Sequence, residues 1–148
     1  FSSINTVGSF LNGEYLTSYV GDDYDNMIEE STTWYLGTVE YSMSYKLAKY
    51  TDVNMSSLTS ARTNAKVGLL RYGELMAGQF NRYDSAIYYW TLTPYSATDL
   101  WSINKYGNVY HYSPSEQRGV RPSVNLKSNV VITSGDGTKE NPFTIELQ

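Results

Sequence analysis

Cysteine is absent from this chain of 148 residues, and its absence excludes disulfide bonds, thiolate metal sites and cysteine nucleophiles. Basic runs are absent too, and the net charge at pH 7 is −4. A protein that follows nucleic-acid phosphates or binds an anionic membrane surface needs a basic patch. No apolar run reaches the length of a membrane-spanning helix. We therefore expect neither a nucleic-acid partner nor membrane contact by this fragment.

The composition indicates a folded domain. Hydrophobic residues make up 41% of the chain and charged residues 18%, a balance typical of globular proteins. A chain of this length suits one domain, residues 1–148, with its own core. It begins at Phe1 without a methionine, so we expect the C-terminal or soluble part of a longer precursor.

Two helices are predicted in the first half of the chain. Apolar residues recur every four or five positions from Phe10 to Val20, which predicts a helix that begins near Ser9. A second helix is predicted over RYGELMAGQF, residues 71–80. Between them, residues 34–47 are expected to form a strand, and the polar residues 50–64 a long loop.

Antiparallel strands are predicted in the second half. AKVGLL (65–70) indicates a buried strand, and AIYYWTLT (86–93) another. LWSINK (100–105) alternates apolar and polar residues and should pair with NVYHY (108–112) through a turn at Gly107 and Asn108. VRPSVNL (120–126) alternates as well, with Val120, Pro122 and Val124 expected to face inward and Arg121 on the polar side. NVVIT and PFTIEL should form a hairpin around the turn SGDG, residues 134–137. The predicted fold class is α+β, with two helices flanking small antiparallel sheets.

Five segments together carry a family resemblance: AKVGLL, YWTLTP, WSINKYGNV, GVRPSVNL and GDGTKENPFTIEL. This order resembles a domain of unknown function in surface, pilus-associated and phage-encoded proteins, chiefly of Gram-positive bacteria. That family is similar in turn to C-type-lectin-like folds, including formylglycine-generating-enzyme modules. The resemblance covers residues 65–147 well, and residues 9–64 only through the first helix and the stretch from Trp34 to Gly37.

The resemblance implies a C-type-lectin-like fold whose loops between Leu92 and Gly119 form an exposed face. In binding members of that fold, the loops just upstream of the last motif contact the ligand. This chain lacks the disulfides of true lectins and their Glu-Pro-Asn or Gln-Pro-Asp tripeptide, which puts calcium-dependent sugar binding in doubt.

Catalysis is disfavoured by the residues available. Formylglycine generation works through cysteines, which this chain lacks. A serine triad would need His111, the only histidine, and no G-x-S-x-G elbow is present. We interpret His111 as a half-exposed strand residue, and we expect no enzyme activity and no cofactor.

Metal binding is also disfavoured. GDDYDN (21–26) offers alternating oxygen ligands, but Met27 stands where an EF-hand loop needs an acidic or amide ligand. A solvated acidic turn is favoured there over a calcium site, and a hairpin turn is favoured for SGDGT. We expect Arg121 to make structural hydrogen bonds, since its planar guanidinium group suits partners in fixed positions. We expect Trp34 and Trp90 to lie in the core.

The remaining signal is a Tyr-rich segment. The chain holds 15 tyrosines but 4 phenylalanines, and tyrosine with serine, glycine and asparagine is typical of recognition surfaces. The predicted ligand-binding residues are Tyr95, Asp99, Trp101, Asn104, Tyr106, Asn108, Tyr110, Tyr112 and Arg118.

Three functions are weighed for this segment. The first is an extracellular or cell-surface adhesion module that binds a protein or glycan through residues 93–118. The second is a structural subunit or tip component of a pilus or surface fibre, in which the tyrosines contact neighbouring subunits. The third, a hydrolase centred on His111, is the least favoured.

Overall fold

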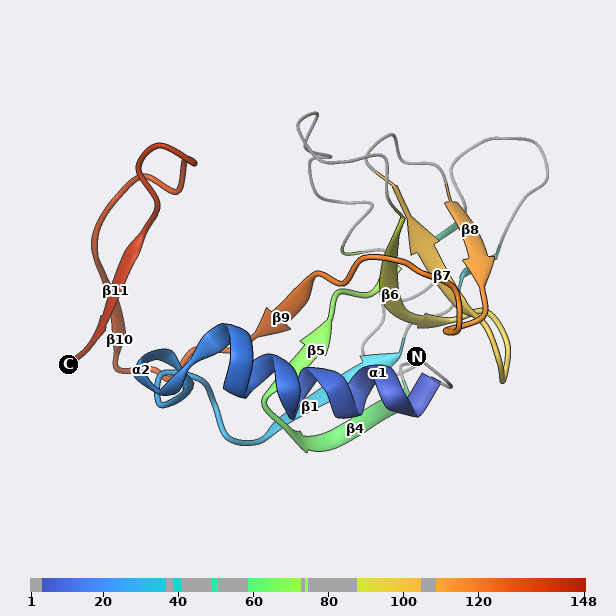
Figure 1. Cartoon of the computed structure of the whole chain (residues 1–148), viewed down its shortest axis with the longest axis horizontal. Coiled ribbons are helices and arrows are strands. Elements are labelled where there is room, and N and C mark those ends of the chain that lie inside the picture. Colours follow the sequence, from blue (N-terminus) through green and yellow to red (C-terminus); the bar gives the residue numbers. More distant parts are fainter. Residues whose placement is uncertain are drawn as a thin grey trace.

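The computed structural model describes residues 4–36, 39–40, 49–50, 59–72, 74, 88–104 and 109–148 (Figure 1). The helical segments it describes are α1 (Ile4–Leu11), a π-helix η1 (Leu16–Val20) and α2 (Asp22–Asp25). The strands are β1 (Thr32–Leu36), β2 (Val39–Glu40), β3 (Lys49–Tyr50), β4 (Thr59–Ala65), β5 (Val67–Leu69), β6 (Tyr89–Pro94), β7 (Leu100–Ile103), β8 (Val109–Tyr112), β9 (Pro122–Val124), β10 (Val130–Ser134) and β11 (Thr144–Leu147). No helix among these residues is long and apolar enough to cross a membrane.

The strands form small antiparallel sheets. β1 pairs with β4, β2 with β3, β5 with β9 and β10 with β11, while β6, β7 and β8 make a sheet of three strands in that order. Backbone bonds join neighbouring sheets: Leu92 N donates to Leu70 O over 2.9 Å, and Trp90 N donates to Gly119 O over 2.9 Å.

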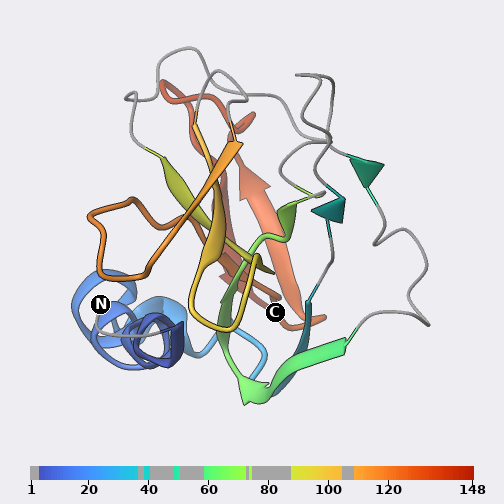
Figure 2. The same cartoon turned by 90° about the vertical axis from the view of Figure 1, so that its right-hand side faces the viewer.

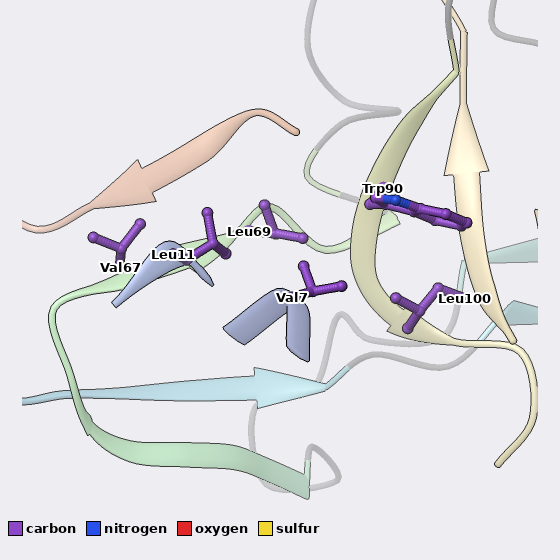
Figure 3. Packing of buried hydrophobic residues seen from close by; sticks show 6 residues of the cluster. All are labelled: Val7, Leu11, Val67, Leu69, Trp90 and Leu100. Atoms are coloured by element: carbon purple, nitrogen blue, oxygen red, sulfur yellow. The ribbon is translucent and has the colours of Figure 1, made fainter. Parts of the chain in front are cut away.

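The core lies between α1 and the strands β5, β6 and β7. Its fully buried members are Val7, Leu11, Val67, Leu69, Trp90 and Leu100 (Figure 3). Side chains from α1 therefore cover β5 and reach the first two strands of the three-stranded sheet. Trp90 is 1% exposed, which confirms its predicted place in the core, and all three residues of β5 are buried as predicted.

The predicted fold class is wrong. Small antiparallel sheets dominate the described residues, and the helical segments are the eight residues of α1 and two shorter stretches. These segments lie together on one side of the strands rather than flanking them (Figure 2). No lectin-like arrangement is confirmed, and most of the second predicted helix, 71–80, lies outside the described residues.

The first helix begins at Ile4, earlier than predicted, and ends at Leu11. At this end of the helix, the side chain of Asn12 bonds across to β5. Its Nδ2 donates to Val67 O over 2.8 Å, and its Oδ1 accepts from Val67 N at 3.0 Å. The apolar stripe that predicted one long helix is thus divided between α1 and η1.

A further prediction fails for a tertiary reason. Residues 59–64 were expected to lie in a loop, but Thr59–Ala65 forms β4, because β1 supplies a partner strand for its polar sequence. In β7 the polar Ser102 alternates with Trp101 and Ile103, yet it is buried as they are. β7 is the central strand of its sheet, and the Ser102 hydroxyl donates to Tyr110 O over 3.0 Å.

Both predicted hairpins are confirmed in their described strands. β7 pairs with β8 and β10 with β11, although the predicted turn at Gly107 and Asn108 lies outside the described residues. At the tip of the terminal hairpin, Gly135 and Gly137 have φ of 89° and 80°, which glycine adopts without strain. Hydrogen bonds from Thr138 lower the pKa of Asp136 between them.

The β9 segment differs from its predicted alternation. Val120 packs against the core cluster, but Val124, predicted to face inward, is 36% exposed. Arg121 lies with its Cζ 4.1 Å from the centre of the Tyr89 ring, so its guanidinium packs on β6.

Lys66 links β5 to the acidic turn, which is therefore not simply solvated. Its Nζ lies 2.7 Å from Asp25 Oδ2 and 3.1 Å from Glu30 Oε1. The bond to Asp25 raises the pKa of Lys66 above its ordinary value of 10.5, and partial burial opposes that rise. Because its pKa is raised in the folded state, the charged form of Lys66 stabilises the fold. This contribution is fully present below the ordinary pKa and is lost as the pH rises through the raised pKa.

We expect Lys66→Met to lower the free energy of unfolding at neutral pH by about 0.5–1 kcal/mol, because the ion pair is partly exposed. The difference from wild type should shrink as the pH rises beyond 10.5. Urea unfolding of both proteins from neutral to alkaline pH measures it. Lys127→Met is the control. It removes a lysine whose Nζ is 3.9 Å from Glu30 Oε1, which is too far for a hydrogen bond. A difference that does not change with pH would contradict the role of the charge.

Candidate recognition surface

The three-stranded sheet positions the candidate site. In the β7–β8 register, Trp101 lies opposite His111 and Ser102 opposite Tyr110. Side chains on a strand alternate between its faces, so Trp101 and His111 belong to one face of the hairpin. β8 is an edge strand of this sheet, so one of its sides has no partner strand among the described residues.

Three parallel rings form what we call the aromatic stack: Tyr95, His111 and Tyr110. The centres of the Tyr95 and His111 rings are 3.7 Å apart and the ring planes differ by 10°. Those of Tyr110 and His111 are 5.2 Å apart with planes 6° apart. Tyr95 is 50% exposed and Tyr110 is 54% exposed. The stack therefore presents two large amphipathic side chains to solvent from fixed positions.

Trp101 supports the aromatic stack from beneath. It is 4% exposed, and its ring meets Tyr95 and His111 edge-on, with centres 5.0 Å and 5.9 Å away. Buried Tyr72 packs edge-on against Trp101 in turn, with ring centres 5.9 Å apart. Edge-to-face contacts of this kind stabilise by about 0.5–1.5 kcal/mol each beyond burial, so the stack is anchored to the interior.

Asp99 orients the histidine at the centre of the stack. Its Oδ2 lies 3.0 Å from His111 Nδ1. Among the described residues, Asp99 is the hydrogen-bond partner of the His111 side chain. The neutral ring can donate from Nδ1 to this carboxylate and leave Nε2 as an acceptor. This contact ties the His111 imidazole to the turn that carries Asp99.

A tight turn between β6 and β7 holds Tyr95 and Asp99 in place. Tyr95 N donates to Asp99 O over 2.9 Å, and Asp99 N donates to Ser96 Oγ over 3.1 Å. Serine and aspartate favour such turns because their side chains bond the local backbone. The turn brings the Tyr95 ring over His111. Asp99, in the same turn, is twelve residues away from His111 in the chain.

A second aromatic group lies beside the stack. Arg118 Cζ is 3.8 Å from the centre of the Tyr112 ring and 5.8 Å from that of Tyr88. The Tyr88 and Tyr112 rings meet edge-on at 5.6 Å. Burial raises the pKa of Tyr88; Tyr112 adds to that rise and Arg118 opposes it. The Arg118 side chain is 20% exposed, and its guanidinium packs against these two rings.

The nine predicted site residues divide into distinct places. Tyr95, Asp99 and Tyr110 lie together at the surface, with Tyr112 and Arg118 in the neighbouring group. Trp101 and Asn104 are buried, at 4% and 6% exposure, and Tyr106 and Asn108 lie outside the described residues.

His111 was missing from the predicted set, although it is the central ring of the stack. Sequence reasoning weighed it as a catalytic base and then as an ordinary strand residue. The signal that points to it is its register, since a residue opposite Trp101 in a hairpin contacts that ring.

Comparison with known proteins gives one match. Residues 6–128 match a family described as Domain of unknown function (DUF6273). No curated protein and no solved structure matches the chain significantly. The matched range includes the aromatic stack and ends at Ser128, before the β10–β11 hairpin.

Proposed function

Because the chain belongs to the DUF6273 family, whose description assigns no function, we propose from the geometry that it is a non-enzymatic recognition module. It binds a protein or glycan at the cell surface or outside the cell, through the aromatic stack. The observation that carries the proposal is the pair of half-exposed rings, Tyr95 and Tyr110, held parallel on either side of His111.

Rigid exposed tyrosines suit recognition because little conformational entropy is lost when a ligand covers them. A tyrosine ring buries a large area, and its hydroxyl group hydrogen-bonds at the same time. Here the ring positions are set before binding by Trp101 and by the Asp99–His111 bond. Preorganisation of this kind lowers the cost of association.

The surroundings of His111 favour binding over hydrolysis. A nucleophilic mechanism requires a hydroxyl or thiol group within hydrogen-bond reach of the histidine. Among the described residues, the hydrogen bond made by His111 is the one to the Asp99 carboxylate. The dyad therefore supports ring orientation, which a recognition surface needs.

Alanine variants of the stack test the proposal. We would screen the wild-type chain on glycan and protein arrays, and then measure the captured ligand against Tyr95→Ala and Tyr110→Ala by calorimetry. Each variant should weaken binding by about 30-fold, as expected for a central aromatic contact worth about 2 kcal/mol. Tyr110→Phe separates the ring from its hydroxyl group.

Tyr24→Ala is the matched control, because Tyr24 is 53% exposed on α2 and belongs to neither aromatic group. Circular dichroism confirms that each variant is folded. If folded Tyr95→Ala and Tyr110→Ala bind like wild type, the stack is not the binding site. If the wild type binds no probe on either array, recognition by this surface is rejected for the ligand classes tested.

A second candidate function is a structural subunit of a pilus or surface fibre. The observation in its favour is at the other end of the molecule, where apolar side chains of the β10–β11 hairpin are exposed. Ile132 is 61% exposed, Phe143 53% and Leu147 39%. Clustered exposed apolar side chains are typical of protein interaction sites.

A further inference from the structure

Tyr95 forms one end of the aromatic stack. One face of its ring lies on the His111 ring, with centres 3.7 Å apart and planes 10° apart. The centre of the Trp101 ring is 5.0 Å from that of Tyr95 and 5.9 Å from that of His111. These three distances place Trp101 beside the line that joins the two stacked rings. Trp101 therefore contacts the edge of Tyr95 and not the face that points away from His111, which we call the outer face.

The exposed fraction of Tyr95 agrees with this arrangement. The residue is 50% exposed, as expected for a ring that has one face and one edge covered. Among the residues that the structure describes, no further ring packs on Tyr95 and no cationic group lies over it. The outer face is therefore a fixed aromatic surface that a ligand can cover.

An aromatic face of this kind attracts cations. The π electrons make the face of the ring negative and its edge positive. An arginine or lysine side chain within about 6 Å of the ring centre is therefore drawn to the face. Arginine suits it better than lysine, because the planar guanidinium group stacks in parallel on a ring.

The chain makes this contact twice within its own fold. Arg118 Cζ lies 3.8 Å from the centre of the Tyr112 ring, and Arg121 Cζ lies 4.1 Å from that of Tyr89. Both tyrosines belong to the three-stranded sheet that positions the aromatic stack. Tyr95 directly follows β6 of the same sheet, and no arginine of the described residues lies over it.

The charges near Tyr95 also favour a cation. Asp99 lies in the same turn as Tyr95, its side chain is 26% exposed, and its Oδ2 bonds the histidine that lies behind the Tyr95 ring. The positive charge of Arg118 is offset by Glu116, whose Oε2 lies 3.8 Å from Arg118 Nη2. The whole chain has 15 acidic residues and 11 lysines and arginines. Electrostatic complementarity therefore favours a basic partner.

We propose that the outer face of Tyr95 binds an arginine side chain of a protein partner. This inference rests on the proposed recognition function and names its partner class, a protein with an exposed basic side chain rather than a glycan. The guanidinium group lies parallel to the Tyr95 ring and extends the aromatic stack by one planar group. His111 and Trp101 hold the ring in place before the partner arrives, which lowers the cost of association.

Two peptides separate the charge of the partner from its shape. Hexa-arginine carries guanidinium groups, and hexacitrulline carries uncharged urea groups of nearly the same shape. In calorimetry with the full chain, hexa-arginine should bind wild type about 5-fold more tightly than it binds Tyr95→Leu, as expected for one exposed cation–π contact. Hexacitrulline should bind both proteins equally weakly.

Two further substitutions are controls. Tyr95→Phe keeps the ring face without the hydroxyl group and should bind hexa-arginine like wild type. Tyr24→Leu, at a tyrosine of α2 that is 53% exposed, should also leave the affinity unchanged. Circular dichroism confirms that each variant is folded.

Three results would overturn the inference. Equal binding of hexa-arginine to wild type and folded Tyr95→Leu would show that net charge attracts the peptide without the ring. Binding of hexacitrulline that matches hexa-arginine and depends on Tyr95 would show that the site selects shape and not charge. The third is a wild type that binds no hexa-arginine at about 1 mM, where a contact of roughly 4 kcal/mol would be half formed.

The peptide test can fail while the proposed function holds. An array ligand that is lost in Tyr95→Ala, together with a failed peptide test, keeps the recognition surface and removes only the arginine partner. A glycan ligand would give this result. If Tyr95→Ala and Tyr110→Ala retain every array ligand, the recognition function itself is rejected.

Discussion

Replacing Trp90 by alanine is expected to lower the free energy of unfolding by about 3–5 kcal/mol. The side chain is 1% exposed and packs in the core cluster with Val7 and Leu100. Its removal forfeits the burial of a large ring and leaves a cavity between α1 and the three-stranded sheet. For a domain of this size the loss corresponds to a fall in melting temperature of about 6–20 °C. Urea unfolding followed by circular dichroism measures it.

Trp90→Phe is the matched control for this substitution. The buried indole Nε1 of Trp90 has no hydrogen-bond partner among the described residues, and an unpaired buried donor is itself unfavourable. Phenylalanine keeps most of the apolar ring and removes that donor, so it should cost much less than alanine. Equal losses for the two variants would show that the cavity is not the cause.

Replacing Gly68 by alanine is expected to destabilise the chain by about 1–3 kcal/mol. Gly68 lies in the middle of β5, directly beneath the ring of Trp34. A Cβ there would lie 2.7 Å from Trp34 Cε2 and closer still to two other ring atoms. The ring cannot easily move away, because Trp34 Nε1 donates to Ala65 O. Thermal and urea unfolding of the variant measure the loss.

A double-mutant cycle isolates the cause of this effect. Trp34→Ala removes the ring that the new methyl group would meet, so Gly68→Ala should cost little in that background. The difference between the two backgrounds is the interaction energy of the pair. If Gly68→Ala costs the same with and without Trp34, the loss comes from the strand backbone rather than from the ring.

Local sequence patterns predicted several elements correctly. Alternation in LWSINK and NVYHY predicted strands that pair, and they do as β7 and β8. The short apolar run around Val67 predicted a buried strand. The SGDG turn predicted the terminal hairpin, where two glycines take positive φ. In each case the signal lies in residues that are neighbours in the chain, such as strand periodicity or turn chemistry.

The failures involve residues that are distant in the chain. Where the N-terminal apolar stripe is interrupted, Asn12 bonds Val67, 55 positions away. Thr59–Ala65 becomes a strand because β1 lies beside it. A periodicity measured along the chain contains no information about these partners.

The candidate site was likewise predictable from the sequence only in part. Its tyrosines and Asp99 are recognisable from composition, since a Tyr-rich segment ending at a core strand is typical of a binding surface. The stack itself depends on the β7–β8 register and on the turn that carries Tyr95 over His111. The apolar face of β10–β11 follows from strand alternation, but its lack of a partner does not. Alternation and turn chemistry act between near neighbours, whereas stacking and exposure depend on how separate segments meet in space.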